Sequence, residues 1–237
     1  MSEKIVGIAG GMGPQSTLDL MQKILVATPA RCEQDHIHLI VDSNPKTPDR
    51  TQAILGTGDS PAETLCEAVR RLTRAGADLI LIPCNTAHAF LDEVQAATSA
   101  PIFNMVDLCA RWAAGRYRRG EVLGLLATTG TLSSGLYERA LGAHGLAVIA
   151  PSPPEQEDLM EAIYGAGGIK MGHVESNAAG VRRLGRALVD RGARAVIAAC
   201  TEVGLVLADC DLPVIDPLRI LAEEAVRQVK GEAREKE

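Results

Sequence analysis

Residues 76–86 read GADLILIPCNT and residues 192–202 read GARAVIAACTE, and the two stretches align without a gap. Each is a short apolar run that ends in a cysteine, Cys84 or Cys200, followed by a polar pair that contains threonine. Apolar runs of this length are typical of buried strands in a parallel sheet. The repeat therefore predicts two similar halves, each with a strand that carries a cysteine at its carboxyl end.

The sequence around the two cysteines repeats as well. Each half opens with a strand-like run that meets a glycine-containing turn, at residues 7–13 and 124–130, and each cysteine is followed by a short strand led by proline, at 101–103 and 213–215. These runs alternate with amphipathic segments of helical length, which is the rhythm of βαβ units. The expected fold is α/β: two similar domains with parallel-rich sheets flanked by helices, related by a pseudo-twofold axis.

The domain boundaries follow from the same repeat. We expect a first domain of residues 1–103 plus 217–237 and a second of residues 104–216, with the amphipathic segment from Leu218 to Val229 returning to the first domain. Ligands of open α/β sheets bind at the carboxyl ends of strands. Two similar domains that face each other would place both cysteines there, so the active site is predicted in the interdomain cleft.

Composition excludes several classes of protein. A hydrophobic content of 46% and a mean hydropathy of +0.07 predict a soluble globular chain, and no apolar run approaches the roughly 20 residues of a membrane span. The net charge of -6 and the 3% aromatic content argue against a nucleic-acid partner. The N-terminus shows no secretory signal, which favours a cytoplasmic location. Neither the six cysteines nor the five histidines have zinc-site spacing, so free thiols and no metal are expected.

Each repeated cysteine lies at a strand-to-helix junction, with Thr86 or Thr201 placed where a cap is expected. A helix N-terminus offers unpaired N–H groups and a positive dipole end, which favour a thiolate and bind a carboxylate. This matters because a free cysteine, with a pKa of about 8.5, is only a few per cent ionised near neutrality.

Two thiols on opposite faces of a bound amino acid suit removal of the α-proton on one face and its return on the other. The α-carboxylate then needs hydrogen-bond donors, and Asn85, Thr86, Thr128 and Thr201 are candidates.

Two cations stand in loop-like segments. Arg50 and Lys170 would each give the side-chain carboxylate of a dicarboxylic substrate a partner, Arg50 in a bidentate manner. The turn at residues 10–14 matches neither the full GxGxxG fingerprint nor a P-loop, and is interpreted as a tight turn that lets backbone approach a small anion. The other cysteines are expected to be inert: Cys32, Cys66, Cys109 and Cys210.

These residues also carry a resemblance. The sequence resembles the aspartate racemase branch of the aspartate/glutamate racemase superfamily over nearly the whole chain, through five motifs taken in order: Gly10-Gly11-Met12-Gly13-Pro14, Pro48-Asp49-Arg50-Thr51, Pro83-Cys84-Asn85-Thr86-Ala87-His88, Ala127-Thr128-Thr129-Gly130-Thr131 and Cys200-Thr201-Glu202.

The resemblance implies a homodimer and racemisation without pyridoxal phosphate (PLP) or any other cofactor, with Cys84 and Cys200 as the two acid/base residues. It also implies that Arg50 and Lys170 contact the distal carboxylate. The pocket would be lined by Met12, Gln15, Asn85, Thr86, Thr128 and Thr201.

Two positions bear on the substrate. Glutamate racemases tend to have His directly after the second Cys-Thr, and Glu202 in that place favours aspartate over glutamate. Ala199 stands where the family usually has Gly, which adds a methyl group near the site. The predicted partner is thus a small dicarboxylic amino acid.

Several alternatives stay open. The first is a glutamate or broad-specificity amino-acid racemase, which would share most of these motifs. A second is an enzyme of the same architecture that uses one cysteine in cis-trans isomerisation or decarboxylation. A third is a non-catalytic dicarboxylate-binding paralogue, and a fourth is a PLP enzyme with Lys170 as Schiff base. His88 either orients Cys84 or is an ordinary helix histidine.

Overall fold

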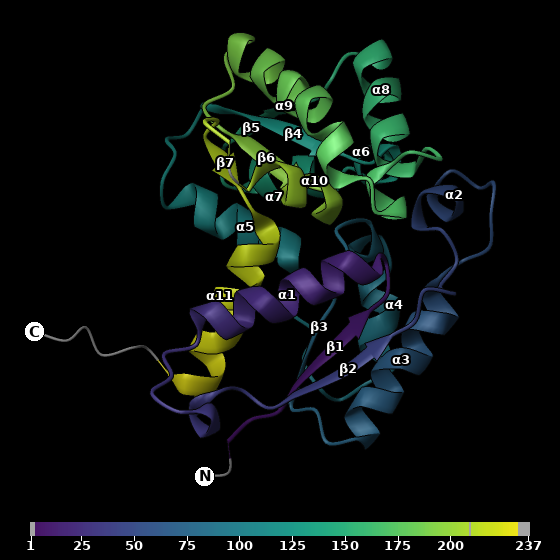
Figure 1. The fold of residues 1–237 in the computed structure, drawn as a ribbon, viewed down its shortest axis with the longest axis vertical. Coiled ribbons are helices and arrows are strands. Elements are labelled where there is room, and N and C mark those ends of the chain that lie inside the picture. Colours follow the sequence, from purple (N-terminus) through teal and green to yellow (C-terminus); the bar gives the residue numbers. More distant parts are fainter. Residues whose placement is uncertain (1–2, 209, 232–237) are drawn as a thin grey trace, which may run out of the picture.

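The computed structural model describes residues 3–208 and 210–231, which form two lobes, each built on one parallel sheet (Figure 1). The first lobe holds a sheet of order β2-β1-β3, and the second a sheet of order β5-β4-β6-β7. The strands are β1 (Val6–Gly10), β2 (Leu39–Ser43), β3 (Leu79–Leu81), β4 (Val122–Ala127), β5 (Ala147–Ile149), β6 (Val196–Ala199) and β7 (Val214–Ile215). All described strand pairs are parallel, as predicted.

Helices cover the sheets of both lobes (Figure 1). In the first half of the chain they are α1 (Pro14–Ala27), η1 (Glu33–Asp35), α2 (Arg50–Ile54), α3 (Ala62–Arg74), η2 (Thr86–Phe90), α4 (Leu91–Ala96) and α5 (Met105–Ala114). In the second half they are α6 (Thr129–Ser134), α7 (Leu136–Ala143), α8 (Pro153–Tyr164), η3 (Ile169–Met171), α9 (Val174–Asp190), α10 (Thr201–Leu207) and α11 (Pro217–Lys230).

The two lobes repeat one packing detail that explains the matching sequences. A Cβ atom built on Gly7 of β1 would lie 2.9 Å from the Cβ of Ala77 and 3.3 Å from that of Leu72. A Cβ on Gly124 of β4 would lie 3.4 Å from the Cβ of Ala193 and 2.9 Å from that of Leu188. In each lobe the helix before the cysteine strand therefore presses on the opening strand at a glycine.

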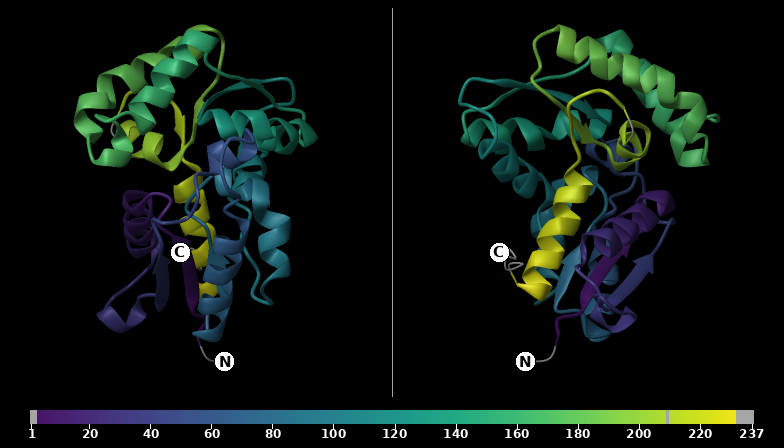
Figure 2. Two further views of the ribbon diagram at one scale, coloured as in Figure 1. Left: turned by 90° about the vertical axis from the view of Figure 1, so that its right-hand side faces the viewer. Right: turned by 60° about the vertical axis from the view of Figure 1, so that its left-hand side comes forward.

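The C-terminal helix ties the lobes together. Asp216 caps α11 by accepting from the N–H of Leu218 at 2.9 Å, and the helix runs from the second sheet along the first lobe, against α1 and α5 (Figure 2). One apolar core cluster contains residues of both sheets, such as Ile8 and Leu125, together with Leu221 of α11. The prediction that the C-terminal helix returns to the first half is confirmed by its contact with α1. The domain boundaries at 103/104 and 216/217 stay a prediction.

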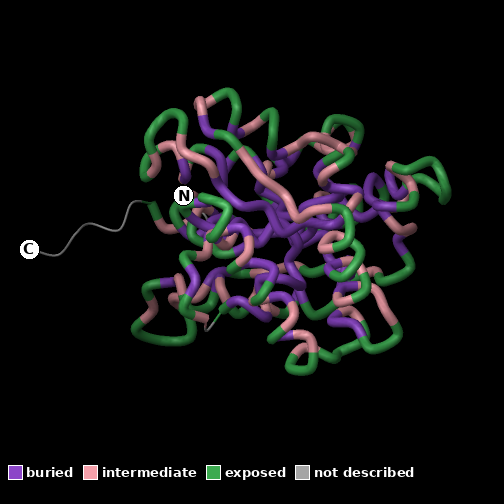
Figure 3. The backbone as a smooth tube through the Cα atoms, turned by 90° about the horizontal axis from the view of Figure 1, so that it is seen from above, coloured by how far each residue is buried: buried purple, intermediate pink, exposed green. Residues whose placement is uncertain are grey.

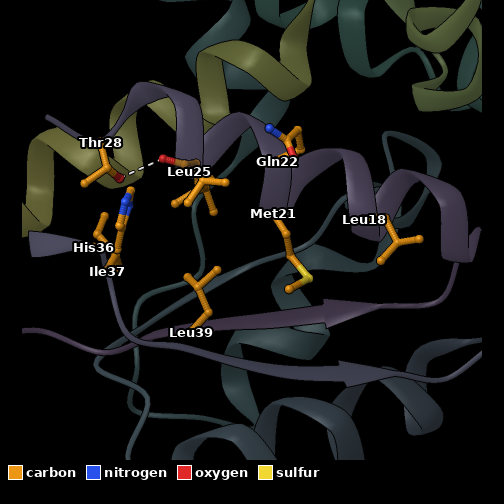
Figure 4. Close-up of a pocket in the computed structure, with 9 residues that line it drawn as sticks. Leu18, Met21, Gln22, Leu25, Thr28, His36, Ile37 and Leu39 are labelled. Carbon is orange, nitrogen blue, oxygen red and sulfur yellow. Dashed lines mark hydrogen bonds between the residues drawn. The ribbon is translucent and has the colours of Figure 1, made fainter. Parts of the chain in front are cut away.

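Burial is greatest in the interior, where β1, β3 and β6 are buried, and many loops on the outside are exposed (Figure 3). One apolar hollow of about 360 Å³ lies between α1 and β2, lined by residues that include Leu18, Met21 and Leu25 (Figure 4). Its lining contains none of the predicted site residues. No helix in the described part of the chain is long and apolar enough to cross a membrane.

Candidate active site

Both repeated cysteines lie at the carboxyl ends of parallel strands, one in each sheet. Cys84 follows β3 and is 6% exposed, and Cys200 directly follows β6 and is 5% exposed. The ammonium group of Lys170 interacts electrostatically with both sulfur atoms, although the two cysteines belong to different lobes. The structure thus brings together the two junctions that the repeat singled out.

Polar side chains join the lobes next to Cys84. The hydroxyl of Thr86 lies 3.0 Å from that of Thr128 and 2.8 Å from that of Thr131. The amide oxygen of Asn85 accepts a hydrogen bond of 2.6 Å from the hydroxyl of Tyr137. Asn85 and Thr86 come from the first lobe and the other three residues from the second, so these bonds hold the lobes in register.

The expected helix caps are wrong. The N-cap positions are Asn85 and Cys200, and neither makes a side-chain cap. Thr86 and Thr201 stand one residue further on, inside the first turn. The Thr86 hydroxyl therefore turns across the lobe interface, and the Thr201 hydroxyl donates to Glu202 Oε2 at 3.1 Å.

Cys200 has a carboxylate as its nearest charged partner. Its thiol donates to Glu202 Oε2 at 3.2 Å. Glu202 is 2% exposed, and its Oε1 accepts from the Gly13 N–H at 3.1 Å, the Ser16 hydroxyl at 3.1 Å and the Lys170 ammonium at 3.2 Å. The charge of this buried carboxylate is therefore compensated by donors from both lobes.

These contacts fix the charges around Cys200. Burial raises the pKa of the Cys200 thiol well above its ordinary value, and the Glu202 carboxylate raises it further, while Lys170 offsets only part of the effect. Burial alone would raise the pKa of Glu202, but Lys170 and the Cys200 thiol lower it. Burial alone would lower the pKa of Lys170, but Glu202 and the Cys200 sulfur reverse this and raise it. Near neutral pH the group consists of a thiol, a carboxylate and an ammonium.

Cys84 has a guanidinium as its charged partner. Asp49 caps α2 and so places Arg50 in its first turn, where Arg50 is 7% exposed. Burial alone would lower the Arg50 pKa, but the Cys84 sulfur and then the Tyr164 hydroxyl raise it. The Arg50 side chain also donates to the carbonyl oxygens of Thr47 at 3.2 Å and Pro48 at 2.9 Å.

Two buried donors near Cys84 lack a partner among the described residues: Arg50 Nε and Asn85 Nδ2. A buried N–H group without a partner is costly, so such groups mark a place where a ligand supplies an acceptor. A carboxylate oxygen has that chemistry.

His88 contacts the backbone carbonyl of Cys84. Its Nε2 lies 3.1 Å from the Met105 N–H and accepts from it, so the ring proton is on Nδ1, which donates to the Cys84 carbonyl at 2.8 Å. Burial lowers the pKa of His88 and keeps it neutral. The interpretation that His88 orients Cys84 is therefore supported through the backbone of the cysteine.

The other predicted residues differ in exposure. Met12 is buried in the same apolar cluster as Cys84, whereas Gln15 is exposed on the first turn of α1. The six cysteines are free, and no group of three or more metal-ligating side chains forms within the described residues.

Sequence reasoning missed several residues of this site. The sequence marks Glu202 as an indicator of substrate preference, and its two-residue spacing from Cys200 is the one local signal for a contact. Tyr164, whose ring lies 5.2 Å from the Lys170 ammonium, gave no sequence signal. The same is true of three residues in lobe contacts: Ser16, Thr131 and Tyr137.

Known proteins share this architecture. The family model described as Asp/Glu/Hydantoin racemase matches residues 9–225. A broad-specificity amino-acid racemase of Bacillus subtilis is 28% identical over 94% of this chain and 96% of its own length.

Among solved structures, the Picrophilus torridus aspartate racemase superposes with a TM-score of 0.85 at 29% identity, covering 96% of this chain and 94% of its own. An aspartate racemase homologue from Pyrococcus horikoshii gives a TM-score of 0.73 at 27% identity, covering 97% of this chain and 100% of its own. These relatives confirm the predicted two-domain α/β fold and the resemblance. The protein belongs to the Asp/Glu/hydantoin racemase family and is a racemase of that family.

Proposed function

We propose that this racemase interconverts L- and D-aspartate by proton transfer between Cys84 and Cys200, without PLP or another cofactor. The observation that carries the proposal is the pair of buried cysteines at equivalent strand ends in the two lobes, both within electrostatic reach of Lys170. A pair of acid/base groups on opposite faces of one carbon inverts its configuration.

The charge partners suggest how the reaction begins. Cys200 is a thiol that donates to Glu202, and the guanidinium of Arg50 lies beside Cys84. We therefore assign the role of first base to Cys84. A Cys84 thiolate takes the α-proton, so the C–H bond breaks, an S–H bond forms and the electron pair moves onto the α-carboxylate. Cys200 then gives its proton to the opposite face of the carbon. The reverse reaction needs the opposite protonation of the same pair, which titrates as a coupled unit.

Substrate recognition is assigned to the unpartnered donors and the cations. Arg50 and Lys170 would bind the side-chain carboxylate, and the Asn85 amide with the N–H groups near Thr86 and Thr201 would stabilise the α-carboxylate as it gains charge. Met12, Gln15 and Thr128 are assigned to the pocket lining.

Two alternatives remain beside aspartate. A broad-specificity amino-acid or glutamate racemase would use the same cysteines, and a dicarboxylate-binding paralogue would use the cations without proton transfer. A Schiff base on Lys170 is disfavoured, because it requires a neutral amine and Glu202 holds this group as an ammonium.

The test is proton NMR of L-aspartate, L-glutamate and L-alanine incubated separately in D₂O with reduced enzyme and no added PLP, with circular dichroism recorded in parallel. We expect loss of the α-proton signal together with decay of optical activity, fastest for aspartate. Faster change of alanine would favour the broad-specificity racemase. No change with any of the three, in a folded protein that binds dicarboxylates, would favour the binding paralogue.

The assembly and location complete the proposal. We infer a homodimer from the resemblance, which light scattering coupled to size-exclusion chromatography checks. A cytoplasmic location rests on the sequence alone, and fractionation of the source cells checks it.

A further inference from the structure

The carboxylate of Glu202 occupies a set of donors suited to a ligand. Its Oε1 accepts from the Gly13 N–H at the start of α1, from the Ser16 hydroxyl and from the Lys170 ammonium. A backbone N–H at a helix N-terminus, a hydroxyl and a cation are the groups that proteins use to bind carboxylates. A Cβ atom built on Gly13 would lie 3.0 Å from Glu202 Oε1, so the carboxylate rests directly on the backbone there.

The Glu202 carboxylate neutralises part of the positive charge that could attract a substrate carboxylate. Lys170 and Glu202 form an ion pair of 3.2 Å with side chains that are 13% and 2% exposed. Arg50 donates to backbone carbonyls and forms no ion pair with a carboxylate within the described residues. The Lys170–Glu202 pair therefore has no net charge, and Arg50 alone faces a substrate that carries two carboxylates in the proposed function.

We infer that Glu202 determines specificity: its carboxylate competes with the side-chain carboxylate of the substrate for Lys170, and so weakens the preference for dicarboxylic over neutral amino acids. The inference rests on the proposed function, because it assigns Lys170 to substrate binding. A neutral amino acid has no second carboxylate and does not enter this competition. The site therefore accepts both classes, with a moderate preference for the dicarboxylic one.

Low exposure makes the competition strong. Charges buried at the lobe interface are screened far less by water and salt than surface charges. The change Glu202→Gln keeps the size of the side chain and an acceptor oxygen for Gly13 and Ser16, but removes the charge that holds Lys170. The freed ammonium then attracts a ligand carboxylate.

The experiment is calorimetric titration at pH 7 of the full-length protein with succinate, which has two carboxylates, and with butyrate, which has the same chain length and one. Glu202→Gln is expected to tighten succinate binding roughly ten- to hundredfold and to leave butyrate binding nearly unchanged. Glu223→Gln is the matched control, since Glu223 carries the same charge but pairs with Arg219 on the exposed face of α11. It is expected to change neither affinity.

A double-mutant cycle assigns the effect to Lys170. In a Lys170→Met background, Glu202→Gln should no longer tighten succinate binding. Glu202→Asp, whose shorter side chain reaches Lys170 less well, should give a smaller gain and serves as the second variant if Glu202→Gln does not fold.

The inference is overturned if the neutral variant binds succinate no better than the parent, if butyrate gains equally, or if the gain persists without Lys170. Absence of succinate binding in every variant would overturn it as well. A protein that shows the expected binding pattern but exchanges no α-proton would instead refute the proposed racemisation, so the two failures are distinguishable.

Discussion

The Cys84 and Cys200 junctions have the same backbone plan and opposite electrostatic surroundings. Each cysteine follows a parallel strand and precedes a helical turn, but Cys84 lies beside the buried guanidinium of Arg50 and Cys200 donates to the buried carboxylate of Glu202. A duplicated scaffold thus supplies two equivalent positions, and the side chains around them place a cation beside one sulfur and a carboxylate beside the other.

Removal of either sulfur should have the largest effect on the reaction. Cys84→Ala and Cys200→Ala are each expected to lower racemisation at least about a thousandfold, because either change deletes one of the two proton carriers. Circular dichroism of aspartate at long incubation measures the loss. Cys66→Ala is the control, since Cys66 is a buried residue of α3. Racemisation at near parental rate by either site variant would contradict the pairing.

Arg50→Lys should keep the positive charge near Cys84 but weaken binding of the substrate carboxylate. Lysine lacks the planar fork of donors, so the contacts to Thr47, Pro48 and the ligand cannot all be kept. We expect the catalytic efficiency kcat/KM for aspartate to fall roughly ten- to hundredfold, with most of the loss in KM. Steady-state kinetics with both enantiomers gives the two constants. An unchanged KM would remove Arg50 from substrate binding.

Glu202→Gln should remove the negative charge beside Cys200, which distinguishes its surroundings from those of Cys84. The Glu202 carboxylate raises the pKa of Cys200, so a neutral side chain lets this pKa fall. The alkaline limb of the rate, which marks loss of the Cys200 proton, is expected to move to lower pH by about one unit. A pH profile of kcat/KM records it. A shift to higher pH would show that Glu202 does not act on Cys200 in this way.

His88→Gln should have the smallest effect, on stability. The folded-state pKa of His88 is lowered from its ordinary value of 6.5. The contribution of neutral His88 to the free energy of unfolding is therefore complete above pH 6.5. It declines as the pH falls below 6.5, because the unfolded chain takes up the proton more easily than the folded one. In urea unfolding, the free energy of unfolding of the parent should fall between about pH 7 and 5. The fall should be smaller in the His88→Gln variant. Equal pH dependence of the two proteins would argue against a neutral buried His88.

The fold could be predicted from the sequence because the patterns that indicate it are local. Apolar runs, glycine turns and the repeated cysteine junctions each lie within a short stretch, and parallel strands place their carboxyl ends at one edge of each sheet. Cys84 and Asn85 could be placed in the same way, since their motif stands at such an end, whereas Arg50 was marked only as a cation in a loop-like segment.

The partners of Glu202 could not be foreseen from sequence. This side chain turns toward Gly13 and Ser16, which are far away in the chain and belong to the other lobe. The prediction that Thr86 caps its helix is wrong for a related reason. Its hydroxyl forms hydrogen bonds with the hydroxyls of Thr128 and Thr131 across the lobe interface. Contacts between lobes depend on how the sheets are placed, which hydropathy patterns do not encode.

The most direct test of the central claim is to follow the α-proton of L- and D-aspartate in D₂O with each single-cysteine variant. If Cys84 and Cys200 serve opposite faces, Cys200→Ala should exchange the α-proton of one enantiomer only and Cys84→Ala that of the other only, without inversion in either case. Exchange of the same enantiomer by both variants, or full racemisation by either, would contradict a division of the two faces between these residues.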